Sequence, residues 1–233
     1  MSDKIDYEFL PKDYPDYDVK FKIVLIGAVT GKTCLCEKIY NGKFPDPVKA
    51  TVGVEFYYIP IKIDNIIIKL MIWDTCGQEA FSSITSAYCK NSDLFMIVYA
   101  ITDRVSFDKI ERYLNDAKSN NGKNCHYFLI GNKKDLEYER RVSKKEGEKF
   151  AKENNIDFFI ETSAKTGENL KAIFIEAAKI LYLSHKEEIE EIEERELEEI
   201  KERELEEIKK RKLEELKEKE KKINDKLMKY ISF

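Results

Sequence analysis

Two glycines, a lysine and a threonine follow an apolar run near the start of the chain, at Gly27, Gly31, Lys32 and Thr33. The run before Gly27 has strand character, and the residues after Gly31 have helix character. The first N–H groups of a helix lack intrahelical partners and lie at the positive end of its dipole, so they bind oxyanions. Lys32 adds positive charge for terminal phosphates, and Thr33 adds a hydroxyl ligand for Mg²⁺. The spacing predicts a phosphate-binding loop.

This loop is one residue shorter than the common pattern, which has four residues between its first glycine and Gly-Lys-Ser/Thr. Only three residues separate Gly27 from Gly31. Either a loop residue is missing, or Ile26 occupies the first glycine position; both interpretations place β-branched Val29 and Thr30 where small residues are usual. We still expect the loop to contact phosphates. Its candidate residues are Gly27, Ala28, Val29, Thr30, Gly31, Lys32, Thr33 and Cys34.

Two further segments carry groups suited to Mg²⁺ and a terminal phosphate. Asp74 ends an apolar run and places a carboxylate at the end of a strand, and Gly77 allows a phosphate to approach the backbone closely. Thr51 offers a hydroxyl for the metal, and Phe44, seven residues earlier, offers an aromatic cover for a base. The predicted metal ligands are therefore Thr33, Thr51 and Asp74.

Asn132, Lys133 and Asp135 follow another apolar run and suit a guanine base. A carboxylate at Asp135 can accept both N–H donors from guanine N1 and the 2-amino group, a pair that adenine lacks. The stem of Lys133 can lie across the base, and Asn132 can tie loops together. Backbone donors near a base carbonyl are expected at Ser163, Ala164 and Lys165. Each motif alone is weak evidence, and their order along the chain carries the prediction.

Alternating apolar runs and amphipathic stretches predict an α/β fold whose six strands form a mostly parallel sheet with helices on both faces. Asp64 and Asn65 predict a hairpin between the second and third strands. Ligands of such sheets bind at the carboxyl ends of the parallel strands. The predicted strands are 21–27, 52–62, 67–73, 94–100, 126–131 and 157–161, and the predicted helices are 31–41, 104–119, 143–154 and 168–183.

Composition divides the chain into an extension at 1–20 without an ordered element, a globular domain at 21–184 and a charged tail at 185–229. Residues 1–184 carry 27 basic and 27 acidic side chains, against 14 and 18 in residues 185–233. This balance disfavours a nucleic-acid partner. Five irregularly spaced cysteines predict reduced thiols and a cytoplasmic location, and no apolar run is long enough to span a membrane.

The tail repeats residues 194–201 as 202–209, and no proline or glycine follows Gly167, so nothing obliges a helix that begins near Glu168 to stop. An eight-residue repeat turns each apolar pair by about 80° from the last, which gives no continuous seam for a heptad coiled coil. Pairs of Glu and Arg or Lys at i,i+4 support a lone helix. A coiled coil and disorder are the alternatives.

With these motifs in place, residues 21–183 resemble the Ras superfamily of small GTPases, and within it the Rab family. The segments 51–56, 69–79, 81–85, 96–102 and 161–169 carry this similarity besides the nucleotide motifs. The resemblance implies a P-loop GTPase domain that binds GTP or GDP with Mg²⁺ and acts as a switch in vesicle trafficking. It also implies effectors that read residues 44–56 and 76–88, an exchange factor and a GTPase activator.

The implied catalytic residues are Lys32, which neutralises phosphate charge, and Gln78, which orients the attacking water. No internal arginine finger is evident, so we expect slow turnover. Cys76, Ala80, Pro45 and Pro47 depart from the Rab pattern. Rab proteins end in prenylated cysteines, whereas the last cysteine here is Cys125. We therefore expect any membrane contact to be peripheral, through the tail or a partner. The alternative function is an interaction scaffold that binds nucleotide poorly and uses its long helix as a spacer.

Overall fold

The computed structural model describes residues 6–77, 88–121 and 125–231. The chain divides into two compact units, residues 1–184 and residues 185–233.

The first unit is built on a seven-stranded sheet in the order β1-β3-β4-β2-β5-β6-β7. Strands β4, β2, β5, β6 and β7 are parallel, whereas β1 and β3 run antiparallel to their neighbours. The predicted hairpin is confirmed, because Ile63 pairs with Ile66 across Asp64 and Asn65. The strands are β1 (Tyr7–Phe9), β2 (Val19–Ile26), β3 (Val54–Ile63), β4 (Ile66–Thr75), β5 (Leu94–Ala100), β6 (His126–Asn132) and β7 (Phe158–Glu161).

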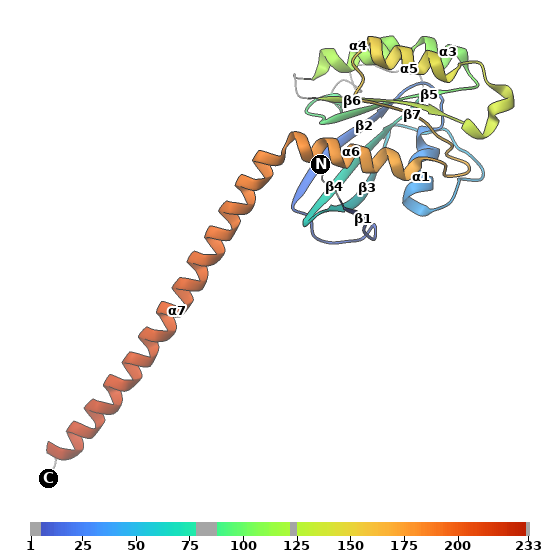
Figure 1. The fold of residues 1–233 in the computed structure, drawn as a ribbon. Helices are drawn as coiled ribbons and strands as arrows, with labels where there is room; N and C mark the ends of the chain where they lie inside the picture. Colours follow the sequence, from blue (N-terminus) through green and yellow to red (C-terminus); the bar gives the residue numbers. More distant parts are fainter. Residues whose placement is uncertain (1–5, 78–87, 122–124, 232–233) are drawn as a thin grey trace. The chain divides into compact units, whose positions relative to one another are not determined.

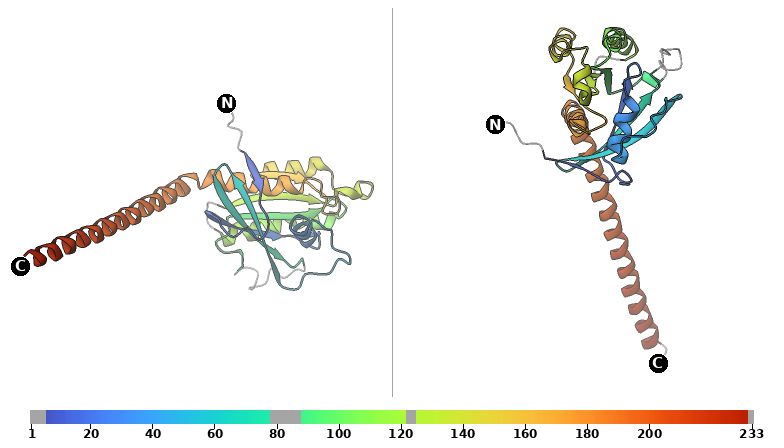
Figure 2. Two further views of the ribbon diagram at one scale, coloured as in Figure 1. Left: turned by 90° about the horizontal axis from the view of Figure 1, so that it is seen from below. Right: turned by 90° about the vertical axis from the view of Figure 1, so that its right-hand side faces the viewer.

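Helices cover both faces of this sheet, as the alternation of strands and helices predicts. In Figures 1 and 2, α1 and α6 lie on one side, and α3, α4 and α5 lie on the other. The helices are α1 (Lys32–Asn41), α3 (Arg104–Asp108), α4 (Ile110–Asn120), α5 (Lys144–Glu153) and α6 (Leu170–Ser184), with a 3₁₀ helix η1 (Lys134–Glu139).

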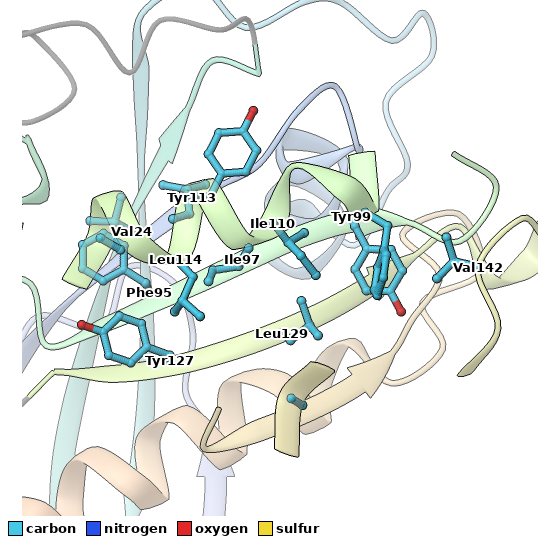
Figure 3. Packing of buried hydrophobic residues seen from close by; sticks show 14 of the residues in the cluster. Val24, Phe95, Ile97, Tyr99, Ile110, Tyr113, Leu114, Tyr127, Leu129 and Val142 are labelled. Carbon is cyan, nitrogen blue, oxygen red and sulfur yellow. The ribbon is translucent and has the colours of Figure 1, made fainter. Parts of the chain in front are cut away.

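The core between β5 and the α3–α4–α5 layer fixes the central strands. Every residue of β5 is buried, and Leu114 of α4 is fully buried among Phe95, Ile97 and Leu129 (Figure 3). Parallel strands buried on both faces read as continuous apolar runs. The carboxyl ends of these strands are thereby held rigidly at one edge of the sheet.

The N-terminal segment corrects two predictions. Strand β1 pairs antiparallel with the far end of β3, so residues 6–20 contain an ordered element and the sheet has seven strands, not six. Phe9 lies beneath the ammonium group of Lys171 at 5.5 Å, and Asp18 accepts a 2.6 Å hydrogen bond from the backbone of Ile67. A strand of three residues is too short to show periodicity, and its partner lies more than 50 residues away in the sequence.

The second unit contains α7 (Lys186–Ile231). The sequence predicts a helix at 168–183 with no proline or glycine that obliges it to stop, and the structure ends α6 at Ser184 and begins α7 at Lys186. The hydroxyl of Ser184 donates to the carbonyls of Ile180 at 2.7 Å and Leu181 at 3.2 Å, a side-chain bond of the kind that bends helices. No helix in the described residues is long and apolar enough to cross a membrane. The state of the tail as a lone helix or a coiled coil stays a prediction.

We predict that Leu114→Ala lowers the free energy of unfolding by about 2–5 kcal/mol, because it opens a cavity in a fully buried layer. Leu183→Ala is the matched control, since Leu183 is 56% exposed and its loss should change stability by less than about 0.5 kcal/mol. Urea unfolding followed by circular dichroism measures both. Equal losses in the two variants would contradict this placement of the core.

Candidate functional site

One cavity of about 420 Å³ opens at the carboxyl ends of the parallel strands. Most of the predicted site residues line it, although they come from segments up to 137 positions apart (28 to 165). The lining comprises residues 28–34, Phe44, Val48, Lys49, Ala50, Thr51, Gly77, Asn132, Lys133, Asp135, Leu136, Ala164 and Lys165. Sequence reasoning missed Val48, Lys49, Ala50 and Leu136, which carry no motif of their own.

The loop at 27–31 is held at both ends by glycines that no other residue could replace without strain. Gly27 has φ 141°, and a Cβ there would lie 2.2 Å from the carbonyl oxygen of Val98 in β5. Gly31 has φ 87°, and a Cβ there would lie 2.8 Å from Nδ2 of Asn132. These close approaches fix the loop against β5 at its start and against Asn132 at its end.

Lys32 is buried beneath the loop and points its ammonium group at the loop backbone. Its Nζ donates to the carbonyl oxygens of Gly27 at 2.9 Å and Ala28 at 3.0 Å. Burial lowers the pKa of Lys32, and the negative charge of Asp74 opposes this shift. The loop is thus lined from below by a desolvated positive charge.

Thr33, Thr51 and Asp74 meet beside Lys32 although they come from α1, the segment before β3 and the end of β4. The hydroxyl of Thr33 hydrogen-bonds with both the hydroxyl of Thr51 and Oδ2 of Asp74. The other carboxylate oxygen of Asp74 is buried and has no hydrogen-bond partner in the described residues. Burial raises the pKa of Asp74 to about 6, against the opposing effects of Thr33 and Lys32.

Two hydroxyls and an unsatisfied carboxylate oxygen are hard oxygen donors, which is the ligand set that Mg²⁺ prefers. A divalent cation among them would satisfy the buried oxygen and stabilise the ionised carboxylate. The residues present therefore fit the magnesium ion that the sequence implies. Within the described ranges no cluster of three or more His, Cys, Asp or Glu side chains forms another candidate metal site.

Asn132 connects three loops through one side chain. Its Nδ2 donates to the carbonyl oxygen of Thr30 at 2.8 Å, and its Oδ1 accepts from the backbone N–H of Ala164 at 3.1 Å. Asn132 and Thr30 are both buried. The phosphate loop, the end of β6 and the segment after β7 consequently form one unit.

Asp135 is oriented by a contact that the sequence did not reveal. The hydroxyl of Ser163 donates to Oδ1 of Asp135 at 2.6 Å. Ser163 is fully buried and does not line the cavity, so it supports Asp135 from behind. Lys133 has a left-handed conformation with φ 69°, and Lys133 and Asp135 both line the cavity, whereas Lys134 between them does not.

An ion pair between Arg140 and Glu161 supports the segment that carries Asp135. Arg140 donates to both carboxylate oxygens of Glu161, at 2.7 and 2.9 Å, and Glu161 is only 4% exposed. The backbone N–H of Lys134 also donates to the carbonyl of Thr162 at 3.0 Å. These contacts join η1 to the segment after β7. Sequence reasoning missed them because the two partners lie 21 residues apart in unrelated motifs.

Of the two predicted partner-binding segments, the structure describes 44–56 in full and 76–88 only in part. Residues 44–56 are described, and their first part lines the cavity. The backbone N–H of Cys76 donates to the carbonyl of Gly53 at 3.1 Å, which joins the two segments. Gln78 and residues 79–87, which include Ala80, lie outside the described residues.

The fold and this cavity define an α/β nucleotide-binding protein with a phosphate loop at a helix N-terminus. A family model described as the Ras family matches residues 22–183 of the chain. The chain therefore belongs to the Ras family, whose members are small GTPases that bind guanine nucleotides.

We predict that Asn132→Ala lowers the free energy of unfolding by about 1–3 kcal/mol, because it leaves the buried carbonyl of Thr30 and N–H of Ala164 unpaired. Asn115→Ala, at an exposed position of α4, is the matched control and should cost less than about 0.5 kcal/mol. Thermal unfolding measures both changes. If the two variants melted together, the bridging role of Asn132 would be refuted.

Proposed function

We propose that the chain is a GTP/GDP-binding molecular switch with slow intrinsic GTP hydrolysis and that it acts, like Rab proteins, in vesicle trafficking. Family membership supports the switch itself. The observation that carries the proposal is that the phosphate loop, the hydroxyl pair Thr33 and Thr51, and Asp135 line one continuous cavity, with the buried carboxylate of Asp74 bonded to Thr33. A guanine nucleotide needs these three contacts at once.

Asp135 is the residue that selects guanine over adenine. Its carboxylate is fixed by Ser163 and faces the cavity, so it can accept hydrogen bonds from N1 and the 2-amino group of guanine. Adenine presents no such pair of donors and would leave the carboxylate unpaired, which is costly in a partly buried site. Lys133 and Phe44 line the same cavity and would flank the base and its sugar.

Phosphate binding falls to the N-terminus of α1 and to Lys32. The N–H groups at the start of α1 and the ammonium group of Lys32 face the same end of the cavity. Thr33, Thr51 and Asp74 would hold Mg²⁺, which supplies charge neutralisation at the phosphates when bound. Asp74 then acts through its carboxylate as a fixed counter-charge to Lys32.

Hydrolysis would require a positioned water and a stabilised leaving group. We assign the water to Gln78 and the charge on the leaving group to Lys32. No arginine is among the described residues that line the cavity. Intrinsic turnover is therefore slow, and an activating partner supplies the missing positive charge.

An aromatic cluster between the two partner-binding segments supports effector binding. Phe56 is 50% exposed and packs edge-on against Trp73 at 4.6 Å, and Trp73 contacts Tyr88 at 5.5 Å. Trp73 and Tyr88 are half-buried and hold the exposed ring of Phe56 in place, so this ring can bury a large area at little entropic cost, which suits a protein interface. We propose effectors at 44–56 and 76–88, an exchange factor and an activator as partners, and a cytoplasmic location with peripheral contact to endomembranes.

The alternative is a scaffold that binds nucleotide poorly and uses α7 as a spacer. The short phosphate loop favours it, and so does the 46-residue charged helix. Stoichiometric guanine nucleotide in the purified full-length protein, with measurable phosphate release, would reject the scaffold.

We predict that Asp135→Ala lowers GDP affinity at least about 100-fold, because two hydrogen bonds to a charged acceptor are lost. Asp135→Asn should instead favour xanthosine diphosphate, since an amide can donate to the 2-carbonyl that xanthine carries. Glu139→Ala, at an exposed position of the same 3₁₀ helix, should bind GDP like the wild type. Equilibrium dialysis with GDP, ADP and xanthosine diphosphate distinguishes these results, and wild-type protein that binds ADP as tightly as GDP would refute the proposal.

We predict a first-order rate of GTP hydrolysis on the order of 10⁻³ s⁻¹ or below at 25 °C, as expected without an arginine in the site. Gln78→Ala should lower this rate at least about tenfold and change GDP affinity less than about threefold, because a water-positioning residue acts only in the chemical step. Single-turnover phosphate release measures the rate. A variant as fast as the wild type would exclude Gln78 from catalysis.

A further inference from the structure

The short phosphate loop uses one of its few backbone N–H donors in a hydrogen bond within the loop. Between Gly27 and Gly31 only Ala28, Val29 and Thr30 can offer N–H groups. The N–H of Thr30 donates to the carbonyl of Ala28 at 2.9 Å, within the loop. Thr30 is also fully buried, and its carbonyl accepts from Asn132. The N–H of Thr30 is therefore turned to the backbone and away from a phosphate.

The donors at the start of α1 remain available. The first intrahelical bond runs from the N–H of Leu35 to the carbonyl of Gly31. The N–H groups of Gly31, Lys32, Thr33 and Cys34 precede this bond in the helix, and all four residues line the cavity. These four N–H groups are donors that the site can offer to phosphate oxygens.

The outer rim of the loop is occupied by the backbone of Gly77. A Cβ on Gly77 would lie 2.5 Å from the carbonyl oxygen of Ala28, 2.8 Å from its carbonyl carbon and 2.9 Å from the backbone nitrogen of Val29. The segment that would meet a third phosphate thus packs on the loop itself. Lys32 likewise commits two of its three N–H donors to the carbonyls of Gly27 and Ala28.

Thr51 does not depend on a third phosphate for its place at the cation site. Its hydroxyl hydrogen-bonds directly with the hydroxyl of Thr33. The contact between Thr33 and Asp74 completes the same cluster. The groups around the cation are therefore held by contacts that a diphosphate leaves intact.

We infer that the shortened loop makes this site selective for the nucleoside diphosphate over the triphosphate. The inner donors at α1 bind the two phosphates that GDP and GTP share. Of the outer groups, the N–H of Thr30 is used in the turn with Ala28, and Gly77 packs closely against Ala28 and Val29. This inference rests on the proposed function, since it concerns the same guanine-nucleotide site. It assigns GDP as the tightly held ligand and leaves the GTP state to be stabilised by a partner.

The test compares dissociation constants of the full-length protein for GDP and for a non-hydrolysable GTP analogue, with Mg²⁺ present. The wild type should bind GDP at least about tenfold more tightly, the effect of one or two lost hydrogen bonds to a charged group. A variant with one glycine inserted between Val29 and Thr30 should reduce this preference to less than about threefold, because it restores the loop length.

Val29→Gly is the matched control, because it removes a β-branched side chain that is 74% exposed without changing the length. The preference for GDP should persist in this variant. Its loss would show that side-chain bulk, rather than loop length, sets the selectivity and would overturn the inference. An insertion variant that binds GDP but keeps the tenfold preference would overturn it as well.

The wild-type comparison decides the matter even where the insertion variant does not fold. Equal affinity for GDP and the GTP analogue, or tighter binding of the analogue, overturns the inference and leaves the proposed function standing. Failure of the wild type to bind either nucleotide more tightly than ADP refutes the proposed function instead. The two failures are therefore distinguishable in one titration series.

Discussion

The side-chain amide of Asn132 is the interaction on which the candidate site depends. It joins the carbonyl of Thr30 to the N–H of Ala164 across segments more than 100 residues apart in the sequence. An amide carries a donor and an acceptor on one rigid plane, so no single apolar or charged side chain could replace both bonds. The same nitrogen limits position 31 to glycine, since a Cβ there would lie 2.8 Å away.

Beside this bridge lie two ionisable groups whose charged forms are destabilised by burial when no ligand is bound. Burial lowers the pKa of Lys32 and raises that of Asp74 to about 6, so each group is biased toward its neutral form. A bound polyphosphate would favour the charged form of Lys32, and a bound cation would favour that of Asp74. Part of the binding free energy is therefore expected to offset desolvation that folding has already imposed.

The sequence was sufficient for the parts of the fold that follow from local patterns. Continuous apolar runs placed the parallel strands, and Asp64 with Asn65 placed the hairpin. It was insufficient for β1, because three residues show no periodicity and the pairing with β3 is distant in sequence. The helix predicted at 168–183 agrees with α6 to within two residues, although no proline or glycine marks its end before α7.

The site shows the same division. Residues with distinctive chemistry, such as Lys32, Asp74 and Asp135, were predicted from motif spacing. The structure places Lys32 and Asp135 in the wall of one cavity and bonds Asp74 to Thr33 of the same wall. The supporting contacts were not predicted. Ser163 behind Asp135 and the ion pair of Arg140 with Glu161 depend on which loops the fold brings together. A single sequence shows which side chains are chemically distinctive, but the residues from other loops that contact them are known only from the three-dimensional structure.

Strand β1 also bears on how this protein can be handled in the laboratory. It covers the far end of β3 from Ile61 to Ile63, where backbone N–H and carbonyl groups would otherwise face solvent. Unprotected sheet edges of this kind recruit strands from neighbouring molecules. A shortened version that starts at Val19, where β2 begins, would leave this edge of β3 unpaired. Aggregation of such a fragment would therefore report on the missing strand and not on the nucleotide site.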